Sequence, residues 1–189
     1  MKLLVLDNYD SFTYNLVHYI EKVSDAGVEV HRNDQIRIEE IERFDKILLS
    51  PGPGIPSEAG ILLELIKTYA ATKDIFGVCL GQQAIAEAFG GSLINLETVF
   101  HGVATPVEVV ADDLLFKDLP EKFNAGRYHS WVVNRADLPS ELTITAIDGS
   151  GQIMALRHNT YNMRAVQFHP ESVLTEYGLQ LISNWVNAK

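Results

Sequence analysis

The chain has 189 residues, of which 47% are hydrophobic and 21% are charged, as expected of one globular domain. Fifteen Lys and Arg residues against 25 Asp and Glu residues give a formal net charge of -10 without a basic cluster, which argues against nucleic-acid binding. The longest uncharged runs, residues 75–86 and 177–188, are too short to cross a bilayer, which takes about 20 apolar residues.

The N-terminus and the cysteine content indicate the compartment. The first residues lead directly into an apolar run and lack the charged, apolar and cleavage regions of a signal peptide. Cys79 is the only cysteine, so the chain can form neither an internal disulfide nor a four-ligand zinc site of the cysteine type. We therefore expect a cytoplasmic protein without a metal site, in which the Cys79 thiol is available for chemistry.

In the first hundred residues, short apolar runs alternate with amphipathic stretches, the pattern of β-α-β units in a parallel sheet. Strands are predicted at residues 3–6, 28–31, 46–49 and 75–79. A first helix is predicted after Asp10 or Ser11, either of which can serve as its N-cap. Further helices are predicted near residues 36–44, 61–71 and 82–89.

After residue 92 the pattern changes to closely spaced strand-like segments, predicted at residues 105–110, 122–128, 131–135, 143–147, 152–157 and 164–168. Thr175 is expected to cap a final helix. We predict an α/β fold with a mixed, largely parallel open sheet that is flanked by helices and by antiparallel strands. No linker or repeat divides the sequence, so residues 1–189 are expected to form a single domain.

The segment Gly77-Val78-Cys79-Leu80-Gly81 lies where a predicted strand ends and a predicted helix begins. A tight turn of this kind strains the backbone of a nucleophile, and flanking glycines remove side chains that would clash there. The start of the following helix favours the thiolate form of Cys79, and the Leu80 N–H is placed to donate to an oxyanion. A buried structural cysteine fits the same five residues.

His169 and Glu171 are separated by Pro170, which keeps this segment extended. Residues two apart in an extended segment face the same side, so the imidazole and the carboxylate can converge on one site. A thiol, an imidazole and an orienting carboxylate are the groups needed for acyl transfer through a thioester. Cys79 and His169 both follow predicted strands, where open α/β sheets place their sites, and this favours a joint site over a surface His-Pro-Glu turn.

A third segment, Ser50-Pro51-Gly52-Pro53-Gly54, follows the predicted strand at residues 46–49. The prolines stiffen the loop and lack N–H groups, so that only Gly52 and Gly54 can donate from residues 51–54. Such a loop lets a ligand approach the backbone closely, although a plain rigid turn explains the composition as well.

Together, three segments resemble the class I (triad) glutamine amidotransferases: residues 50–54, residues 77–84 and Phe168-His169-Pro170-Glu171-Ser172. More narrowly, two further segments are similar to the small glutaminase subunit of anthranilate synthase or aminodeoxychorismate synthase: residues 6–15 and Gly126-Arg127-Tyr128-His129-Ser130-Trp131. The resemblance extends from residue 2 to about residue 186. It implies the flavodoxin-like fold of that family, a mixed sheet flanked by helices.

The resemblance implies roles for the matching residues. Cys79 would attack the side-chain amide of glutamine, His169 would protonate the departing ammonia and later activate water, and Glu171 would orient His169. The backbone N–H groups of Gly52 and Leu80 would form the oxyanion hole. The amino-acid end of glutamine would be held by Gly52, Pro53, Gly54, Gln83, Ser130 and Trp131.

The resemblance also implies a partner, because glutamine hydrolysis releases ammonia and the sequence has neither a Walker loop nor a Gly-x-Gly-x-x-Gly motif for chemistry that would consume it. The partner would be a chorismate-using synthase subunit, component I of anthranilate synthase or of aminodeoxychorismate synthase. It would hold magnesium, whereas this chain would carry no cofactor. Anthranilate synthase component II is our main interpretation, and the aminodeoxychorismate synthase subunit is the alternative.

Two positions depart from the family pattern. Gln82, three residues after Cys79, stands where the family usually has His, and Val103 stands where it usually has Lys. Neither position belongs to the expected triad. We expect Gln82 to leave the chemistry intact.

Other functions fit parts of the sequence. Residues 7–15 join the first strand to the first helix, where doubly wound folds bind phosphate, so a flavin-binding, flavodoxin-like module is an alternative from another class. The three expected triad residues also fit a hydrolase of another small amide or ester. A catalytically silent regulatory subunit is disfavoured because all three residue types are present.

Overall fold

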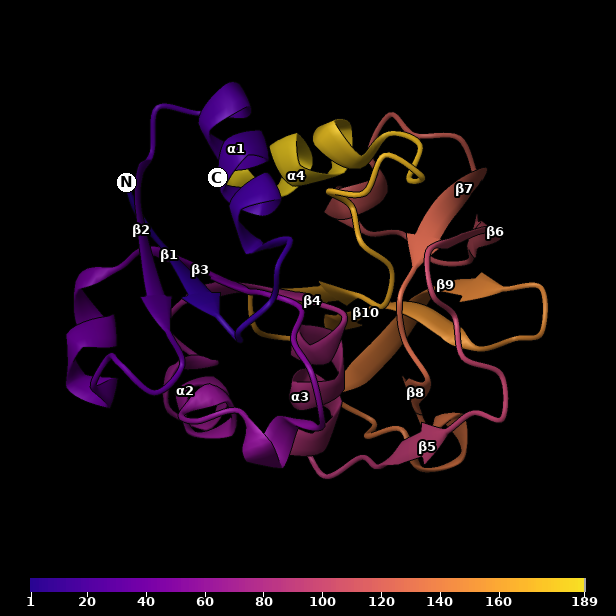
Figure 1. Cartoon of the computed structure of the whole chain (residues 1–189), viewed down its shortest axis with the longest axis horizontal. Coiled ribbons are helices and arrows are strands. Elements are labelled where there is room, and N and C mark those ends of the chain that lie inside the picture. The colour runs from indigo at the N-terminus through magenta and orange to yellow at the C-terminus, as the bar shows by residue number, and fades with distance from the viewer. Residues whose placement is uncertain (189) are drawn as a thin grey trace.

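The computed structural model describes residues 1–188 and is built around a large twisted sheet with helices on both faces (Figure 1). Its nine strands lie in the order β2-β1-β3-β4-β11-β10-β9-β6-β7. The first five are parallel: β2 (Gly27–Arg32), β1 (Lys2–Asp7), β3 (Lys46–Leu49), β4 (Asp74–Val78) and β11 (Met163–Val166). The others continue the sheet antiparallel: β10 (Ile153–His158), β9 (Leu142–Asp148), β6 (Val103–Val109) and β7 (Lys122–Arg127).

Two helices cover each face of the parallel strands. Helices α1 (Thr13–Val23) and α4 (Gly178–Val186) lie on one face, and α2 (Leu62–Tyr69) and α3 (Leu80–Ala88) lie on the other (Figure 1). Short 3₁₀ segments occupy Ile38–Arg43, Pro56–Glu58, Leu114–Phe116 and Arg135–Asp137. Two short strands, β5 (Leu93–Asn95) and β8 (Trp131–Val133), pair in a separate antiparallel sheet.

The apolar runs of the sequence become strands with both faces buried. In β1, Leu3 and Val5 pack into the core beneath α1 and α4, whereas Leu4 and Leu6 pack into the core beneath α2 and α3. Successive side chains of a strand point to opposite faces, so a central strand between two helical layers must be apolar at every position. This requirement explains the continuous apolar run of residues 3–6.

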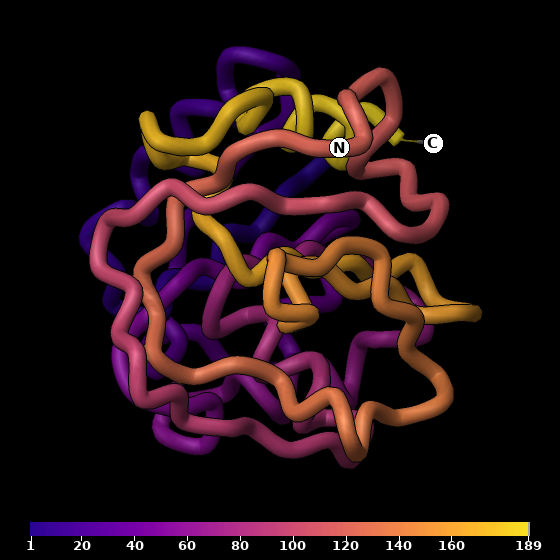
Figure 2. The backbone as a smooth tube through the Cα atoms, turned by 90° about the vertical axis from the view of Figure 1, so that its right-hand side faces the viewer, coloured from indigo at the N-terminus to yellow at the C-terminus, as the bar shows by residue number. Residues whose placement is uncertain are grey.

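The predicted mixed, largely parallel α/β sheet is confirmed, and the antiparallel strands extend it on one side, beyond β11. Seen from that side, the pink to orange segments lie in front of the indigo N-terminal part (Figure 2). The helix predicted near residues 36–44 is instead a 3₁₀ segment of six residues. The strand at Leu93–Asn95 was not predicted, because it is three residues long and mostly exposed and therefore has no clear alternation.

Both predicted N-caps are wrong. Helix α1 follows Phe12, which occupies the N-cap position, and the Asp10 carboxylate accepts a hydrogen bond from the Phe12 N–H at 2.8 Å, ahead of the helix. Helix α4 follows Tyr177, whose φ of 59° turns the chain into the helix. The Thr175 hydroxyl instead donates to the His169 carbonyl at 2.6 Å and so fixes the backbone of the segment that carries His169.

Within residues 1–188, no helix combines the length and the apolar character that a membrane crossing requires.

Candidate active site

Cys79 lies in the turn between β4 and α3, as the glycine spacing predicts. Its φ is 53°, a conformation that is strained for a residue with a side chain. A Cβ atom at Gly77 would lie 2.6 Å from the Gly81 carbonyl carbon, and one at Gly81 would lie 2.7 Å from the Leu49 carbonyl oxygen. Only glycine fits at either position: Gly77 lets the first turn of α3 approach β4, and Gly81 lets it pack against β3.

The sheet order brings His169 to the same edge as Cys79. Strand β11 pairs in parallel with β4, with Val166 opposite Val78, and the Cys79 N–H donates to the Val166 carbonyl at 2.8 Å. His169 follows β11 by three residues, and its N–H donates to the Gly126 carbonyl of β7 at 3.0 Å. Two residues 90 positions apart thus leave adjacent parallel strands at their carboxyl ends, where such sheets form sites.

His169 and Glu171 form a buried pair. The Nδ1 atom of His169 lies 2.7 Å from Oε1 of Glu171, and the side chains are 3% and 0% exposed. The rings of Phe12 and Tyr128 pack on the imidazole, with centroids 6.2 and 4.8 Å from its own. The carboxylate and the two rings therefore hold the imidazole in one orientation.

Electrostatics couple this pair to the cysteine. The Nε2 atom of His169 is buried and makes no regular hydrogen bond within residues 1–188, but Cys79 lies close enough to interact with the imidazole. Burial alone lowers the pKa of His169. The combined effects of Cys79 and Glu171 outweigh it and raise that pKa to about 11. At neutral pH the site therefore favours an imidazolium beside the Cys79 sulfur.

A pocket of about 280 Å³ opens beside the thiol, close to the lower limit of typical small-molecule sites at about 300 Å³. All six residues expected to hold glutamine line it together with Cys79: Gly52, Pro53, Gly54, Gln83, Ser130 and Trp131. Residues 99–101, Tyr128 and His129 complete the wall. Tyr128 and His129 belong to a segment that resembles the family, whereas sequence reasoning missed residues 99–101, because nothing in them identifies them as facing a ligand.

The two expected oxyanion donors occupy suitable backbone positions. Leu80 is the first residue of α3, and the first N–H groups of a helix have no partner within it. Gly52 lines the pocket next to Cys79, and a Cβ atom there would lie 2.6 Å from Asn8 Cβ and nearer still to the Asn8 carbonyl. The Asn8 side chain fixes this loop by donating to the Ser50 carbonyl at 2.8 Å.

In the pocket wall, a buried histidine, His129, fixes the segment that carries Trp131. The Arg127 Nε–H donates to His129 Nε2 at 3.0 Å, so the ring proton lies on Nδ1 and is donated to the Trp131 carbonyl at 3.0 Å. Burial, and then the Arg127 charge, lower the pKa of His129 to about 3. Gln83 Nε2 donates to the same carbonyl at 2.9 Å. His129 is therefore neutral and supports the pocket wall.

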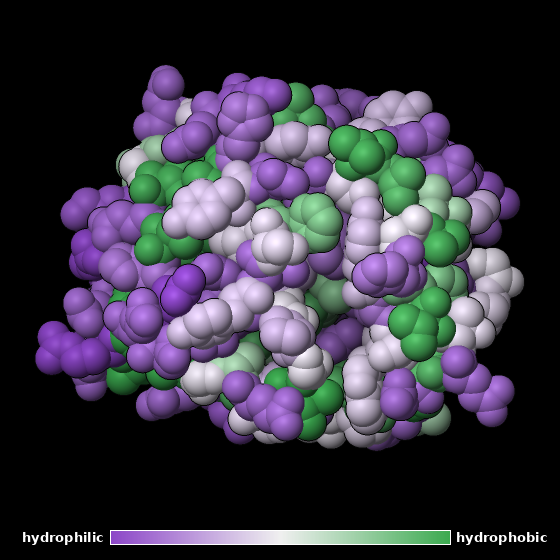
Figure 3. All heavy atoms as spheres, in the orientation of Figure 1, coloured by the Kyte–Doolittle hydropathy of each residue, from purple (hydrophilic) through white to green (hydrophobic). Residues whose placement is uncertain are grey.

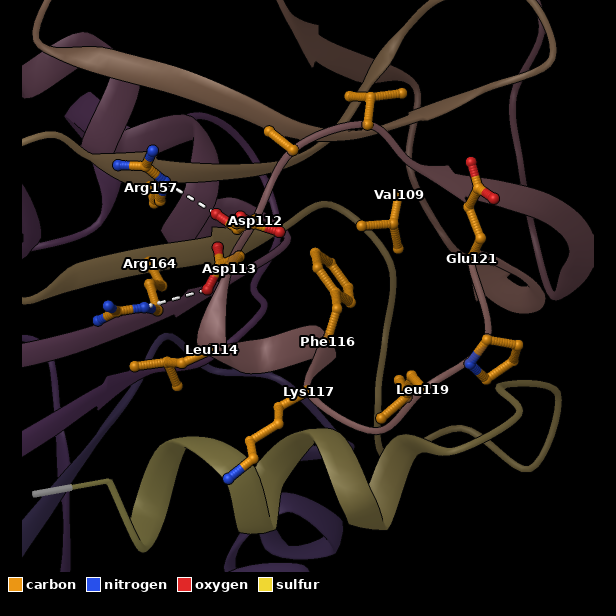
Figure 4. A pocket seen from close by; sticks show the side chains of 13 residues that line it. Val109, Asp112, Asp113, Leu114, Phe116, Lys117, Leu119, Glu121, Arg157 and Arg164 are labelled. Carbon is orange, nitrogen blue, oxygen red and sulfur yellow. Dashed lines mark hydrogen bonds and ion pairs between the residues drawn. The ribbon is translucent and has the colours of Figure 1, made fainter.

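A larger hollow of about 780 Å³ lies elsewhere, between the segment from Val109 to Glu121 and strands β10 and β11 (Figure 4). The Arg157 Nε–H donates to the Asp112 carbonyl and the Arg164 Nε–H pairs with the Asp113 carboxylate, both at 3.1 Å. Its wall contains no cysteine, histidine or hydroxyl side chain. The hollow therefore lacks the groups for nucleophilic catalysis.

The loop after β1 does not resemble a phosphate cradle. The Asp7 carboxylate accepts hydrogen bonds from the Tyr9 N–H at 2.9 Å, the Asp10 N–H at 3.2 Å and the Thr13 hydroxyl at 2.9 Å. A protein carboxylate thus occupies the donors that a flavin phosphate would need. This contact argues against the flavin-binding alternative.

The arrangement places a cysteine and a buried His–Glu pair at the carboxyl edge of an α/β sheet, and these are the groups that acyl transfer through a thioester requires. The family model for class-I glutamine amidotransferase matches residues 4–188. The aminodeoxychorismate/anthranilate synthase component 2 of Bacillus subtilis is 46% identical over 186 residues, which cover 97% of this chain and 95% of that protein. Anthranilate synthase component 2 of Pseudomonas aeruginosa is 46% identical over 192 residues, with 97% and 94% covered.

Among solved structures, a glutamine amidotransferase from Thermotoga maritima has the same fold, with a TM-score of 0.76 over 90% of this chain and 76% of that one at 17% identity. The chain belongs to the class I glutamine amidotransferases. Within them it belongs to the family of component 2 of anthranilate synthase and aminodeoxychorismate synthase, and it is a glutamine amidotransferase enzyme.

Proposed function

We propose that Cys79, His169 and Glu171 hydrolyse the side-chain amide of glutamine and that the ammonia passes to a chorismate-using synthase subunit. The observation that carries this proposal is the adjacency of β4 and β11, which brings a strained cysteine and a buried His–Glu pair to one pocket. Glutamine fits the pocket in size, and the pocket wall offers both backbone and amide groups to a polar amino acid.

The charge state of the site sets the order of the steps. The Cys79 thiolate attacks the amide carbon, and the negative charge that develops on the amide oxygen is met by the N–H groups of Gly52 and Leu80. The imidazolium of His169 gives its proton to the departing nitrogen, which leaves as ammonia. The resulting thioester holds the acyl group while the imidazole becomes neutral.

Water completes the cycle. Neutral His169 takes a proton from a water molecule, whose oxygen attacks the thioester carbon, and collapse of the intermediate expels the Cys79 thiolate and releases glutamate. Glu171 keeps the ring oriented in both halves through its 2.7 Å contact with Nδ1. The starting ion pair is thereby restored.

Several observations support a protein partner at this edge. Relatives are named as component 2 of two-component synthases. Exposed apolar side chains occur on segments next to the catalytic edge: Tyr9, Tyr14, Val99, Val103 and Val173. The face seen in Figure 3 is hollowed near its middle, and apolar side chains lie in separate patches around the hollow. Such patches around a site favour a docking surface.

The partner we infer is component I of anthranilate synthase, with component I of aminodeoxychorismate synthase as the alternative, since the name of the Bacillus subtilis relative includes both. Magnesium would be held by that partner and not by this chain.

The test is glutamate release from glutamine by the wild type and by Cys79→Ser. We expect the wild type to release glutamate and the serine variant to release none above background, because a serine hydroxyl at this position is a far weaker nucleophile than a thiolate. Wild-type turnover in the serine variant would refute Cys79 as the nucleophile. Simple esters serve as the second substrate, and their faster hydrolysis would identify a general hydrolase.

A further inference from the structure

Gln167 joins the cysteine to the pocket wall, and neither the proposed triad nor the proposed glutamine contacts include it. It directly follows β11 and is fully buried. Its Nε2 atom donates to Cys79 Sγ at 3.4 Å, and its Oε1 atom accepts from Gln83 Nε2 at 3.3 Å. Its backbone N–H donates to the Met154 carbonyl at 2.8 Å, which holds the residue to β10.

The direction of these hydrogen bonds is determined at the end of the network that lies farthest from Cys79. The Trp131 carbonyl can only accept, so Gln83 must present its NH₂ group there, at 2.9 Å. The second hydrogen of that NH₂ group is donated to Gln167 Oε1. Gln167 therefore turns its own NH₂ group toward the sulfur, and the reverse orientation would place two donors or two acceptors together.

A donor aimed at the sulfur acts on its charge. An N–H group stabilises a neighbouring anion more than the neutral acid, so this contact favours the thiolate. The same network uses both hydrogens of Gln83 Nε2, so that within residues 1–188 the Oε1 atom of this pocket-lining side chain is left to accept from a ligand. A carbonyl oxygen in that position suits a cationic ammonium group of a bound amino acid.

We propose that Gln167 is a positioning residue, which stabilises the Cys79 thiolate through its Nε2–H and fixes the orientation of Gln83 through its Oε1. This inference rests on the proposed role of Cys79 as the nucleophile. According to this inference, one side chain, that of Gln167, is hydrogen-bonded both to the nucleophile and to the wall that binds the substrate.

The experiment measures the rate of Cys79 alkylation by iodoacetamide against pH, without glutamine. Cys79 is the only cysteine, so the rate reports this sulfur alone. We expect Gln167→Met, which removes the donor at nearly constant volume, to move the midpoint of the profile upward by about one pH unit, the size expected for one hydrogen bond to a charged group. The KM for glutamine should also rise, because Gln83 loses one of its two hydrogen-bond partners and keeps only the Trp131 carbonyl.

Gln82→Met is the matched control, since Gln82 is equally buried but bonds only to the Ile153 carbonyl, at 3.5 Å. Its midpoint should equal that of the wild type. Gln167→Glu provides a second variant, because its carboxylate accepts from Gln83 but offers the sulfur no donor and adds a negative charge. We expect its midpoint to rise at least as far as that of Gln167→Met.

An unchanged midpoint in either folded Gln167 variant would overturn the inference. The alkylation profile does not depend on glutamine turnover, so this result is distinguishable from failure of the proposed function, which Cys79→Ser tests.

Discussion

At the scale of single residues, the site depends on one strained backbone position. Cys79 has a positive φ although it is not glycine, and its neighbours Gly77 and Gly81 have no room for a side chain. Such strain persists only where the surrounding structure enforces it, and here β3, β4 and α3 do so. Packing around the turn therefore offsets the backbone strain at Cys79, which holds the sulfur at the sheet edge.

Gln82, which stands where the family usually has His, affects the stability of the fold. Its side chain is fully buried, its Oε1 atom has no hydrogen-bond partner within residues 1–188, and its one bond is 3.5 Å long. We predict that Gln82→Met raises the free energy of unfolding by about 1 kcal/mol, because an unsatisfied buried oxygen is removed. Urea denaturation measures this change.

Glutaminase turnover of Gln82→Met should equal that of the wild type. A loss of stability would show that the Gln82 amide makes hydrogen bonds stronger than its geometry indicates. Much faster turnover in Gln82→His would contradict our expectation that Gln82 leaves the chemistry intact.

His129 predicts a pH dependence of stability. Its pKa is lowered to about 3 in the folded protein, first by burial and then by the Arg127 charge, whereas an unfolded histidine titrates near 6.5. The unfolded chain therefore binds more protons between pH 6.5 and pH 3, so stability is lost as the pH falls through this window. From pH 7 to pH 5 the loss from His129 is about 2 kcal/mol.

The measurement compares urea denaturation of the wild type and His129→Asn at pH 7 and pH 5. Asparagine does not titrate, and its amide can still donate to the Trp131 carbonyl. We expect the variant to lose less stability than the wild type between the two pH values, by about 2 kcal/mol. Equal losses would show that His129 does not carry this dependence.

At the scale of elements, the parallel pairing of β4 with β11 makes the site, and a different contact holds the opposite edge. Lys46 Nζ in β3 donates to the Asp74 carboxylate at 2.7 Å and to the Trp185 and Ala188 carbonyls at 2.9 and 3.2 Å. Asp74 also accepts from the Trp185 indole N–H at 2.8 Å. This network ties the end of α4 to the amino ends of β3 and β4.

We predict that Lys46→Met lowers the free energy of unfolding by about 3 kcal/mol, since it leaves Asp74, whose side chain is only 19% exposed, without its counter-charge. Lys122→Met is the control, because its partner Glu108 is 44% exposed, and its effect should be about 1 kcal/mol or less. Denaturation of both variants measures the difference. If Lys46→Met lowered the free energy of unfolding as little as Lys122→Met does, α4 would be held by apolar packing alone.

The elements also show what the sequence could predict. The run at residues 3–6 and the glycines around Cys79 are local signals, and each gave the correct strand or turn. The partners of Gln167 and Thr175 are set by tertiary contacts, with Cys79 88 positions away and with the His169 carbonyl. Thr175 looked like a helix cap because only its neighbours in sequence could be considered. The His129 network escaped prediction for the same reason.

At the scale of the whole molecule, the chain presents its pocket and several exposed apolar side chains at one edge of the sheet. A partner that covers this edge would exclude water and shelter the released ammonia before it is protonated. The chain alone has an open pocket. Its activity as a subunit should therefore depend on the complex.

We predict that the isolated chain hydrolyses glutamine slowly and that adding component I raises its turnover about tenfold or more, a coupling of ordinary size between two sites. Glutamate release with increasing component I measures the effect. Val173→Asp, which places a charge on a side chain that is 97% exposed, should weaken the stimulation without changing turnover of the isolated chain. Equal turnover with and without component I would indicate a free-standing glutaminase.

The most direct test uses the complex with component I, chorismate and magnesium, and supplies nitrogen either as glutamine or as ammonium. Product fluorescence is followed for the wild type and for Cys79→Ser. We predict that the serine variant makes no aromatic product from glutamine and makes it from ammonium at the wild-type rate. Product formation from glutamine by Cys79→Ser at the wild-type rate would contradict the account.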